Sequence, residues 1–149
     1  MKNSLLNHLF IAIILLFGAS NLKSQTNDSI TGSWKTFDDE TNQPAAIVLI
    51  SEKNGLFSGV VAKLLDPSAL PTCEKCTDAR KGKSVVGMEI LTGLKKTSDA
   101  YSGGQILDPD DGEIYRATIH LTDQGNKLDL RAYIGIPFLG RTQTWTRER

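Results

Sequence analysis

The chain has 149 residues and an even charge balance, with 17 lysines and arginines against 17 aspartates and glutamates. Its length suits one domain with a hydrophobic core of its own. An even balance excludes the basic surface that neutralises phosphates, so we do not expect nucleic acid as a partner.

The first residues have the pattern of a secretory leader. A basic start at Lys2 precedes an unbroken apolar run over residues 9–17, and small and polar residues follow. This order predicts a signal peptide, because the apolar run is about half the ~20 residues that a membrane-spanning helix needs. We expect cleavage after Ser24, with Ser20 as the competing site. The leader would then be residues 1–24, and the product would be exported, periplasmic or secreted, with no membrane span.

The predicted mature chain, residues 25–149, holds a single histidine, His120. One histidine excludes a multi-histidine metal site within the chain, and a Ser/His/Asp triad would have to use it. We therefore expect no metal and no cofactor, and a binding or interaction protein rather than an enzyme.

The mature chain alternates short β-branched and aromatic runs with Gly, Asn, Asp and Pro. Turn signals about 8–15 residues apart are typical of a sandwich or a barrel. We predict an all-β fold, a single antiparallel barrel of about eight strands, with a β-sandwich as the alternative. The expected strands are residues 30–37, 45–51, 56–64, 85–91, 101–107, 114–122, 127–134 and 141–147.

Three connections have the residues of hairpin turns. Asn54-Gly55 and Asp111-Gly112 tolerate positive φ, and residues 123–126 suit a slightly longer loop. These links predict neighbouring strands that pair antiparallel in chain order. The segment 66–83 is different, because it is long and polar and contains both cysteines.

Alternation divides two of the predicted strands into an apolar and a polar face. Residues 114–122 place Ala117 and Ile119 on one face, and residues 127–134 do the same with Leu128 and Leu130. Such a division describes sheets with one face in water. We favour the apolar faces inside, which leaves either a filled core or a pocket for a small ligand. The alternative is a polar lumen, with Arg131, Tyr133 and Gln143 inside.

Gly32-x-Trp34 opens the first predicted strand, and Trp145-Thr146-Arg147 ends the last one. This arrangement resembles lipocalins, in which the indole lies across the barrel floor under a basic residue from the last strand. The resemblance implies a structural plug made by Gly32, Trp34 and Arg147, with Arg131 as the other candidate cover.

A more specific resemblance covers nearly the whole mature chain. It is similar to the bacterial exported family of unknown function DUF2147, whose known fold resembles a lipocalin. The resemblance implies the fold and an envelope location but no reaction. Ala132 stands where that family usually has glycine. The motifs that carry the match are Gly32-x-Trp34, Asp38-Asp39, Cys73-x-x-Cys76, Gly103-Gly104, Asp108-Pro109, Tyr115, Arg131-Ala132-Tyr133-Ile134-Gly135 and residues 140–147.

Cys73 and Cys76 allow three interpretations. A metal site would need more ligands than two thiols and a distant His120. A thioredoxin-like pair would need a βαβ unit, which the pattern lacks. A small structural disulfide in an oxidising compartment is the remaining interpretation and the one we favour.

Two acidic segments suggest chemistry but are better explained as solvated turns. Residues 108–113 do not match a calcium-binding EF-hand loop, because glycine falls at the fifth position and Ile119 at the twelfth. Asp38 and Asp39 are adjacent, so on a strand they would point to opposite faces rather than converge.

Three functions follow from these observations. The first is a binding protein for a small apolar or amphipathic ligand, with segment 66–83 near the mouth and residues 136–139 as an apolar rim. The second is an interaction module with a filled barrel and a still unknown protein partner. The third is a thiol redox enzyme using Cys73 and Cys76. The candidate ligand-binding residues are Arg131, Tyr133, Phe138, Gln143 and Trp145.

Overall fold

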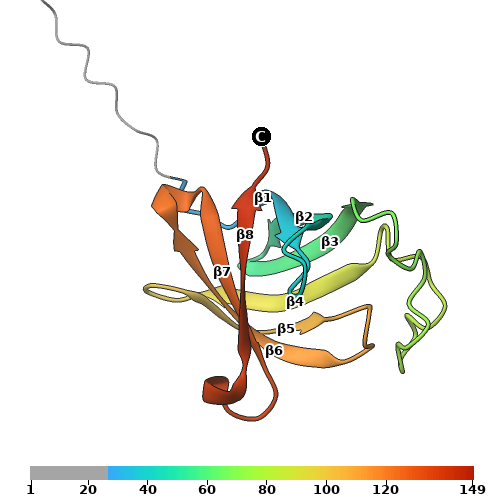
Figure 1. Cartoon of the computed structure of the whole chain (residues 1–149). Coiled ribbons are helices and arrows are strands. Elements are labelled where there is room, and N and C mark those ends of the chain that lie inside the picture. The colour runs from blue at the N-terminus through green and yellow to red at the C-terminus, as the bar shows by residue number, and fades with distance from the viewer. Residues whose placement is uncertain (1–26) are drawn as a thin grey trace, which may run out of the picture.

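Eight antiparallel strands, each hydrogen-bonded to the next along the chain, close into one barrel (Figure 1). The computed structural model describes residues 27–149, so the predicted leader over residues 1–24 lies outside the described part. Single-turn 3-10 helices, η1 and η2, lie in the last two connections. The elements are β1 (Gly32–Phe37), β2 (Pro44–Lys53), β3 (Leu56–Leu64), β4 (Glu89–Lys96), β5 (Tyr101–Leu107), β6 (Ile114–Thr122), η1 (Asp123–Gly125), β7 (Lys127–Tyr133), η2 (Pro137–Leu139) and β8 (Arg141–Arg147).

The first and last strands close the barrel. Trp34 lies opposite Arg147, and Lys35 lies opposite Thr146. An open two-sheet sandwich has no such pairing, so the predicted all-β barrel is confirmed. Closure also removes the free edges that an eight-strand meander would otherwise expose.

The fourth strand differs from the expectation. Residues 85–91 were the predicted segment, whereas β4 begins at Glu89 and ends at Lys96. Gly87 has φ +89° and donates its N–H to the Val61 carbonyl, so the chain turns before the strand starts. Val85 is nonetheless buried at the end of the long connection. Val85 therefore packs into the core from a loop. Its β-branched side chain favours a strand by propensity, which is why a strand was predicted there.

The alternating apolar side chains of β6 and β7 point into the barrel. Leu128, Leu130 and Ala132 are at most 4% exposed, and Ala117 and Ile119 at most 1%. The polar-lumen alternative grouped Arg131, Tyr133 and Gln143 on one face, and that grouping is wrong. Residues directly opposite each other share a face, so Gln143, which pairs with Leu130, lies inside. Arg131 and Tyr133 alternate with the buried residues and lie outside.

Trp34 fills the closed end of the barrel. Its side chain is completely buried, and its Nε1–H donates to the Ile30 carbonyl at 2.8 Å. The Arg147 guanidinium carbon lies 4.2 Å from the ring centroid. The same guanidinium donates at 2.7–2.8 Å to three carbonyls, those of Ser29, Thr31 and Gly125. Burial lowers the pKa of Arg147 from its ordinary value.

The Gly-x-Trp pattern has a steric reason at this end. Gly32 has φ +123°, and a Cβ on it would lie 2.9 Å from Arg147 Nη1. Glycine therefore lets the guanidinium reach the tryptophan face, because it supplies both the backbone conformation and the space.

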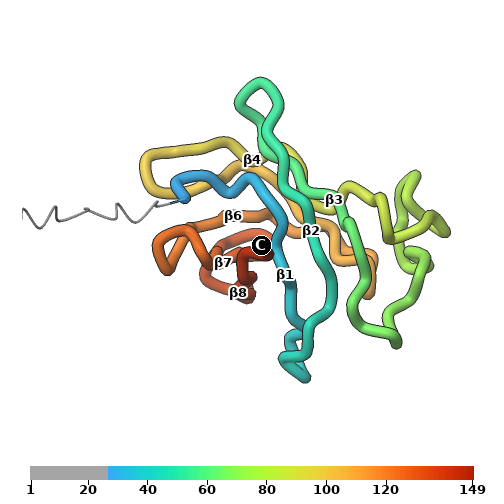
Figure 2. The backbone as a smooth tube through the Cα atoms, turned by 90° about the horizontal axis from the view of Figure 1, so that it is seen from above, coloured from blue at the N-terminus to red at the C-terminus, as the bar shows by residue number. Residues whose placement is uncertain are grey.

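A meander places alternate connections at the same end of the barrel. Figure 2 shows the long connection between β3 and β4, residues 65–88, beside the turn between β5 and β6, residues 108–113. The two are in close contact, because a Cβ on Gly112 would lie 2.1 Å from the Lys75 carbonyl oxygen. Together with the β1–β2 turn they surround the open end.

Candidate functional site

A cavity of about 390 Å³ occupies the open half of the barrel. Its deep wall is apolar and includes Val48, Val61 and Leu130, with Trp145 beside them. Trp145 is 1% exposed, so the indole belongs to the packed wall rather than to the surface. The connections 38–43, 65–88 and 108–113 supply the rim.

A chain of polar contacts runs from the deep wall to the rim. Trp145 Nε1 donates to Gln143 Oε1 at 3.1 Å, and Gln143 Nε2 donates to Asp39 Oδ1 at 2.8 Å. Arg141 then bridges two turns, with its guanidinium nitrogens 2.9 Å from Asp39 Oδ2 and 2.5 Å from Asp108 Oδ2. The turns that carry Asp39 and Asp108 are thereby held together by one side chain.

Tyr115 extends this network along the rim. Its hydroxyl donates to Asp111 Oδ2 at 2.7 Å, and the Arg141 guanidinium carbon lies 5.5 Å from its ring centroid. The hydrogen bond to Asp111, together with partial burial, raises the pKa of Tyr115 to about 12. The phenol is therefore neutral at ordinary pH and acts as a hydrogen-bond donor.

Asp110 lies at the same rim in a crowded acidic setting. Partial burial raises the pKa of Asp110 above its ordinary value, and the neighbouring charges of Asp108 and Asp111 raise it further. Lys75 opposes that increase only in part. The rim thus holds more negative charge than its own cations neutralise.

Two of the five candidate ligand-binding residues line the cavity, and three do not. Gln143 and Trp145 are in the wall. Tyr133 lies on the outer face of β7. Arg131 also lies outside, where its guanidinium donates to the carbonyls of Pro137 and Phe138.

Phe138 is part of an apolar turn that projects from the barrel. It is 86% exposed, and its neighbour Leu139 is 74% exposed. Arg131 donates hydrogen bonds to the backbone of this turn and so fixes the position of the residues that carry the exposed apolar side chains. The turn is absent from the cavity lining, so residues 136–139 do not form the apolar rim that we expected.

Cys73 and Cys76 form a disulfide, as predicted. Their side chains are at most 1% exposed and pack against the β5–β6 turn, with Cys73 Sγ 3.5 Å from the Pro109 carbonyl oxygen. Thiol exchange requires a thiolate to reach one sulfur, and this burial blocks that approach. The geometry favours a structural bridge that shapes one side of the mouth.

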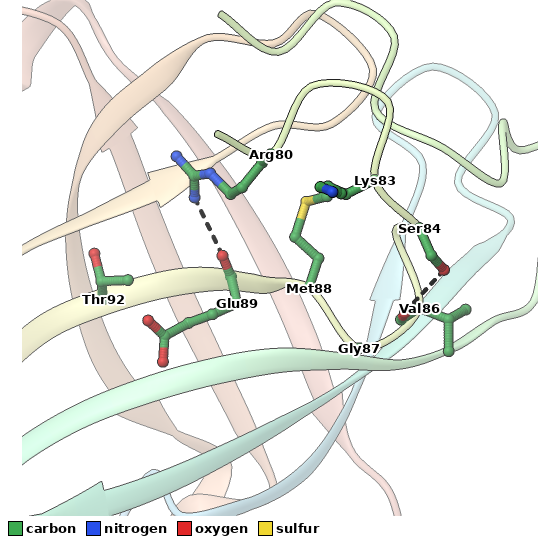
Figure 3. A pocket seen from close by; sticks show the side chains of 8 residues that line it. All are labelled: Arg80, Lys83, Ser84, Val86, Gly87, Met88, Glu89 and Thr92. Carbon is green, nitrogen blue, oxygen red and sulfur yellow. Dashed lines mark hydrogen bonds between the residues drawn. The ribbon is translucent and has the colours of Figure 1, made fainter. Parts of the chain in front are cut away.

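A second hollow lies outside the barrel wall, where the long connection crosses β4 (Figure 3). It is larger, about 660 Å³, but it is a wide surface depression rather than an enclosed space. Figure 3 shows Arg80 reaching the Glu89 carbonyl, at 3.1 Å, and Ser84 bonded to the Val86 carbonyl. These polar side chains are engaged with backbone, so the barrel cavity is the better candidate site.

The carboxylates of the rim are spread over separate turns. In residues 27–149, no three histidine, cysteine or carboxylate side chains converge closely enough to hold a metal ion. The same part of the chain contains no helix long and apolar enough to cross a membrane.

The family model described as "Uncharacterized protein conserved in bacteria (DUF2147)" matches residues 32–147. The chain belongs to this family. The match runs from Gly32 of β1 to Arg147 of β8, so it contains the whole barrel. No match was found among curated proteins.

Among solved structures, this member of the family is similar to a protein from Helicobacter pylori. That structure is described as "Protein HP1028 from the human pathogen Helicobacter pylori belongs to the lipocalin family". The TM-score is 0.70 at 22% sequence identity, over 81% of this chain and 84% of the other. At that identity the similarity shows the fold, which is lipocalin-like.

Arg141, Asp39 and Asp108 were not predicted to form one site. Their proximity could have been inferred, because in a meander the first, third, fifth and seventh connections between strands all lie at the same end of the barrel. The acidic segments 38–40, 66 and 108–111 all fall in odd-numbered connections. Combining topology with charge would have brought them together.

Proposed function

We propose that this protein is exported and binds a small apolar or amphipathic molecule in the open half of its barrel. The observation that carries the proposal is the 390 Å³ cavity between Trp145 and the rim. Ligand sites in proteins are typically concave spaces of about 300–1,000 Å³, mostly apolar, with a few convergent polar groups. An eight-stranded barrel is wide enough to hold one small ligand.

The wall supplies both kinds of contact that such a ligand needs. Val48, Val61 and Leu130 offer apolar surface, which stabilises a bound hydrocarbon by about 25 cal/mol per Å² removed from water. Two hydrogen bonds fix the Gln143 side chain: it accepts one from Trp145 and donates one to Asp39. In this proposal Gln143 and Trp145 contact the ligand, and Arg131, Tyr133 and Phe138 do not.

Native mass spectrometry of protein purified from its source is the direct test. We expect a co-purifying small molecule on the unaltered protein. Ala132→Phe and, separately, Ala46→Phe place a ring in the cavity and should remove that molecule. Thr118→Phe is the matched control, because Thr118 faces outside, and it should keep the ligand.

Circular dichroism and thermal unfolding show whether each variant keeps the barrel. Folded cavity-filling variants that retain the same bound molecule would contradict binding in this cavity. A protein that carries no small molecule and binds none of the probes described below would contradict the proposed function as a whole.

Export is the second part of the proposal, and it rests on the leader pattern of residues 1–24. Determining the N-terminus of the protein recovered from the cell envelope and from the medium tests it. We expect the mature chain to begin at Gln25. A protein that retains Met1 and stays in the cytoplasm would contradict export.

The exposed apolar turn favours a second candidate function, contact with another envelope protein. Ile136, Phe138 and Leu139 are 58%, 86% and 74% exposed, and contiguous apolar surface of this kind often marks an interaction site. Envelope pull-down with the unaltered protein and with Phe138→Ser distinguishes the two. Partner capture that requires Phe138, with an empty cavity, would favour this candidate.

A further inference from the structure

We infer that the ligand is a cationic amphiphile, with its apolar chain against the deep wall beside Trp145 and its positive head at the acidic rim. This inference rests on the proposed function and makes it specific, because it assigns the ligand's charge. The deep wall and the rim of the cavity differ in chemistry, and the ligand has to match both.

The first observation is the charge of the cavity lining. Seven carboxylic acids line the cavity, and Arg141 is the single basic residue among the lining residues. The acids come from three connections that are far apart in sequence and meet at the mouth. They are Asp38, Asp39, Glu40, Asp66, Asp108, Asp110 and Asp111.

The second observation is that the one cation is already neutralised. Arg141 pairs with both Asp39 and Asp108 and lies over the Tyr115 ring. None of the other five carboxylates forms an ion pair with a lysine or arginine within residues 27–149. An anionic head would therefore meet uncompensated negative charge with no free guanidinium to bind it.

The third observation is the separation of the two kinds of surface. The acids belong to the turns, whereas Val48, Val61, Leu130 and Trp145 belong to the strands below them. Clefts lined by one sign of charge over low-dielectric walls concentrate the field and attract the opposite charge. A molecule with a positive head and an apolar chain satisfies both surfaces in one orientation.

The setting of Asp110 agrees with this reading. Partial burial disfavours the negative charge of Asp110, and repulsion from its neighbours Asp108 and Asp111 adds to that effect. A bound cation would relieve that repulsion. An organic cation suits the rim better than a metal ion, because the described carboxylates do not gather into a group of three that could coordinate one.

Isothermal titration calorimetry with three probes of the same chain length tests the inference. The probes are octyltrimethylammonium, 1-octanol and octanoate, each below its aggregation concentration, at pH 7 and low salt. We expect the cation to bind most tightly and octanoate least, with about a tenfold or larger difference between these two. The advantage of the cation should shrink as salt is added, because exposed charges are screened.

A double variant, Glu40→Gln with Asp110→Asn, removes two rim charges. Neither side chain makes a hydrogen bond within the described residues, so the fold should be unaffected. We expect octyltrimethylammonium to bind about fivefold or more weakly, since one charge pair at about 4 Å in water is worth about that factor. Binding of 1-octanol should change little.

The matched control is Glu89→Gln with Asp99→Asn, which removes the same net charge away from the cavity lining. It should leave all three affinities within about twofold of the unaltered protein, because both side chains are exposed outside the cavity lining and their charges are screened. Equal losses in both double variants would mean that net charge alone acts, and would overturn a specific rim.

The outcomes separate the inference from the proposed function. If 1-octanol or octanoate binds as tightly as the cation, and Ala132→Phe abolishes that binding, the charge assignment is wrong while the cavity function stands. If calcium chloride alone binds and displaces the cation at equal concentration, the rim takes an inorganic ion and the inference is overturned. If no probe binds, the inference is overturned, and the proposed function fails with it only when no small molecule co-purifies with the protein.

Discussion

The two ends of the barrel use the same pair of residue types for opposite purposes. At the closed end Trp34 lies under Arg147, and at the open end Trp145 lies in the wall below Arg141. Arg147 covers its indole and binds three carbonyls, so the Trp34 ring is completely buried. Arg141 instead points to carboxylates across the mouth and leaves a cavity beneath it.

In this barrel the partners of each arginine, and not its presence alone, account for whether its end is closed. Main-chain carbonyls pull the Arg147 guanidinium inward over the ring. Carboxylates on two rim turns hold the Arg141 guanidinium at the edge. One end therefore stabilises the fold, and the other leaves room for a ligand.

The largest difference between the ends is expected when each tryptophan is removed. Trp34→Ala should lower the free energy of unfolding by about 3–5 kcal/mol, because it leaves a sealed cavity and an unsatisfied Ile30 carbonyl. Trp145→Ala should cost less, since its space joins a cavity that already reaches the mouth. Urea denaturation measures both. Equal costs would contradict the contrast between a plug and a wall.

The two arginines should differ in the same direction. Arg147→Met should cost about 2–4 kcal/mol, because it leaves three partly buried carbonyls without their hydrogen-bond donor and removes the charge over the Trp34 ring. Arg141→Met should cost about 1 kcal/mol or less, since its ion pairs are partly exposed. A larger loss for Arg141 than for Arg147, again by urea denaturation, would reverse the assignment of the two ends.

The disulfide should matter mainly at the open end. Replacing Cys73 and Cys76 together by serine should lower the free energy of unfolding by about 2 kcal/mol, as expected for so short a loop. Amide hydrogen exchange should become faster in residues 65–88, which contain the bridge, and in residues 108–113, against which it packs, and stay slow around Trp34. The reduced unaltered protein is the control and should behave like the variant.

The smallest effect concerns the rim phenol. Asp111→Asn removes the carboxylate that accepts the Tyr115 hydrogen bond, so the Tyr115 pKa should fall from about 12 towards its ordinary value of 10. The native contact favours the protonated phenol, so its contribution to stability is complete below pH 10 and is lost as pH rises towards 12. NMR titration of the Tyr115 ring measures the change, and Asp99→Asn should leave it unaltered.

Local patterns were enough to predict most of the fold. Asn54-Gly55 predicts a two-residue turn, and Lys53 does pair with Leu56 across it. The alternation in residues 114–122 and 127–134 predicts the buried faces, because side chains on a strand alternate with a period of two. The predicted strand over residues 85–91 was wrong at residues 85–88, where Gly87 and its hydrogen bond to the Val61 carbonyl turn the chain before β4.

The candidate site was less predictable, because its residues meet only through register and closure. Gln143 lies inside since it pairs with Leu130, and no local pattern in residues 141–147 reveals that partner. Arg131 was a candidate ligand-binding residue and would lie inside only in the polar-lumen alternative, yet its partners are the carbonyls of Pro137 and Phe138.

The sequence alone was enough to show which segments extend and where the chain turns tightly, and its resemblance to lipocalins named Arg147, with Arg131 as the alternative, as the cover of Trp34. Those properties depend on the intrinsic preferences of neighbouring residues and on one recognisable pattern. Only the tertiary structure decided that three acidic turns and Arg141 surround one cavity. Charges from distant segments act on each other through space, and their distances exist only once β1 has paired with β8.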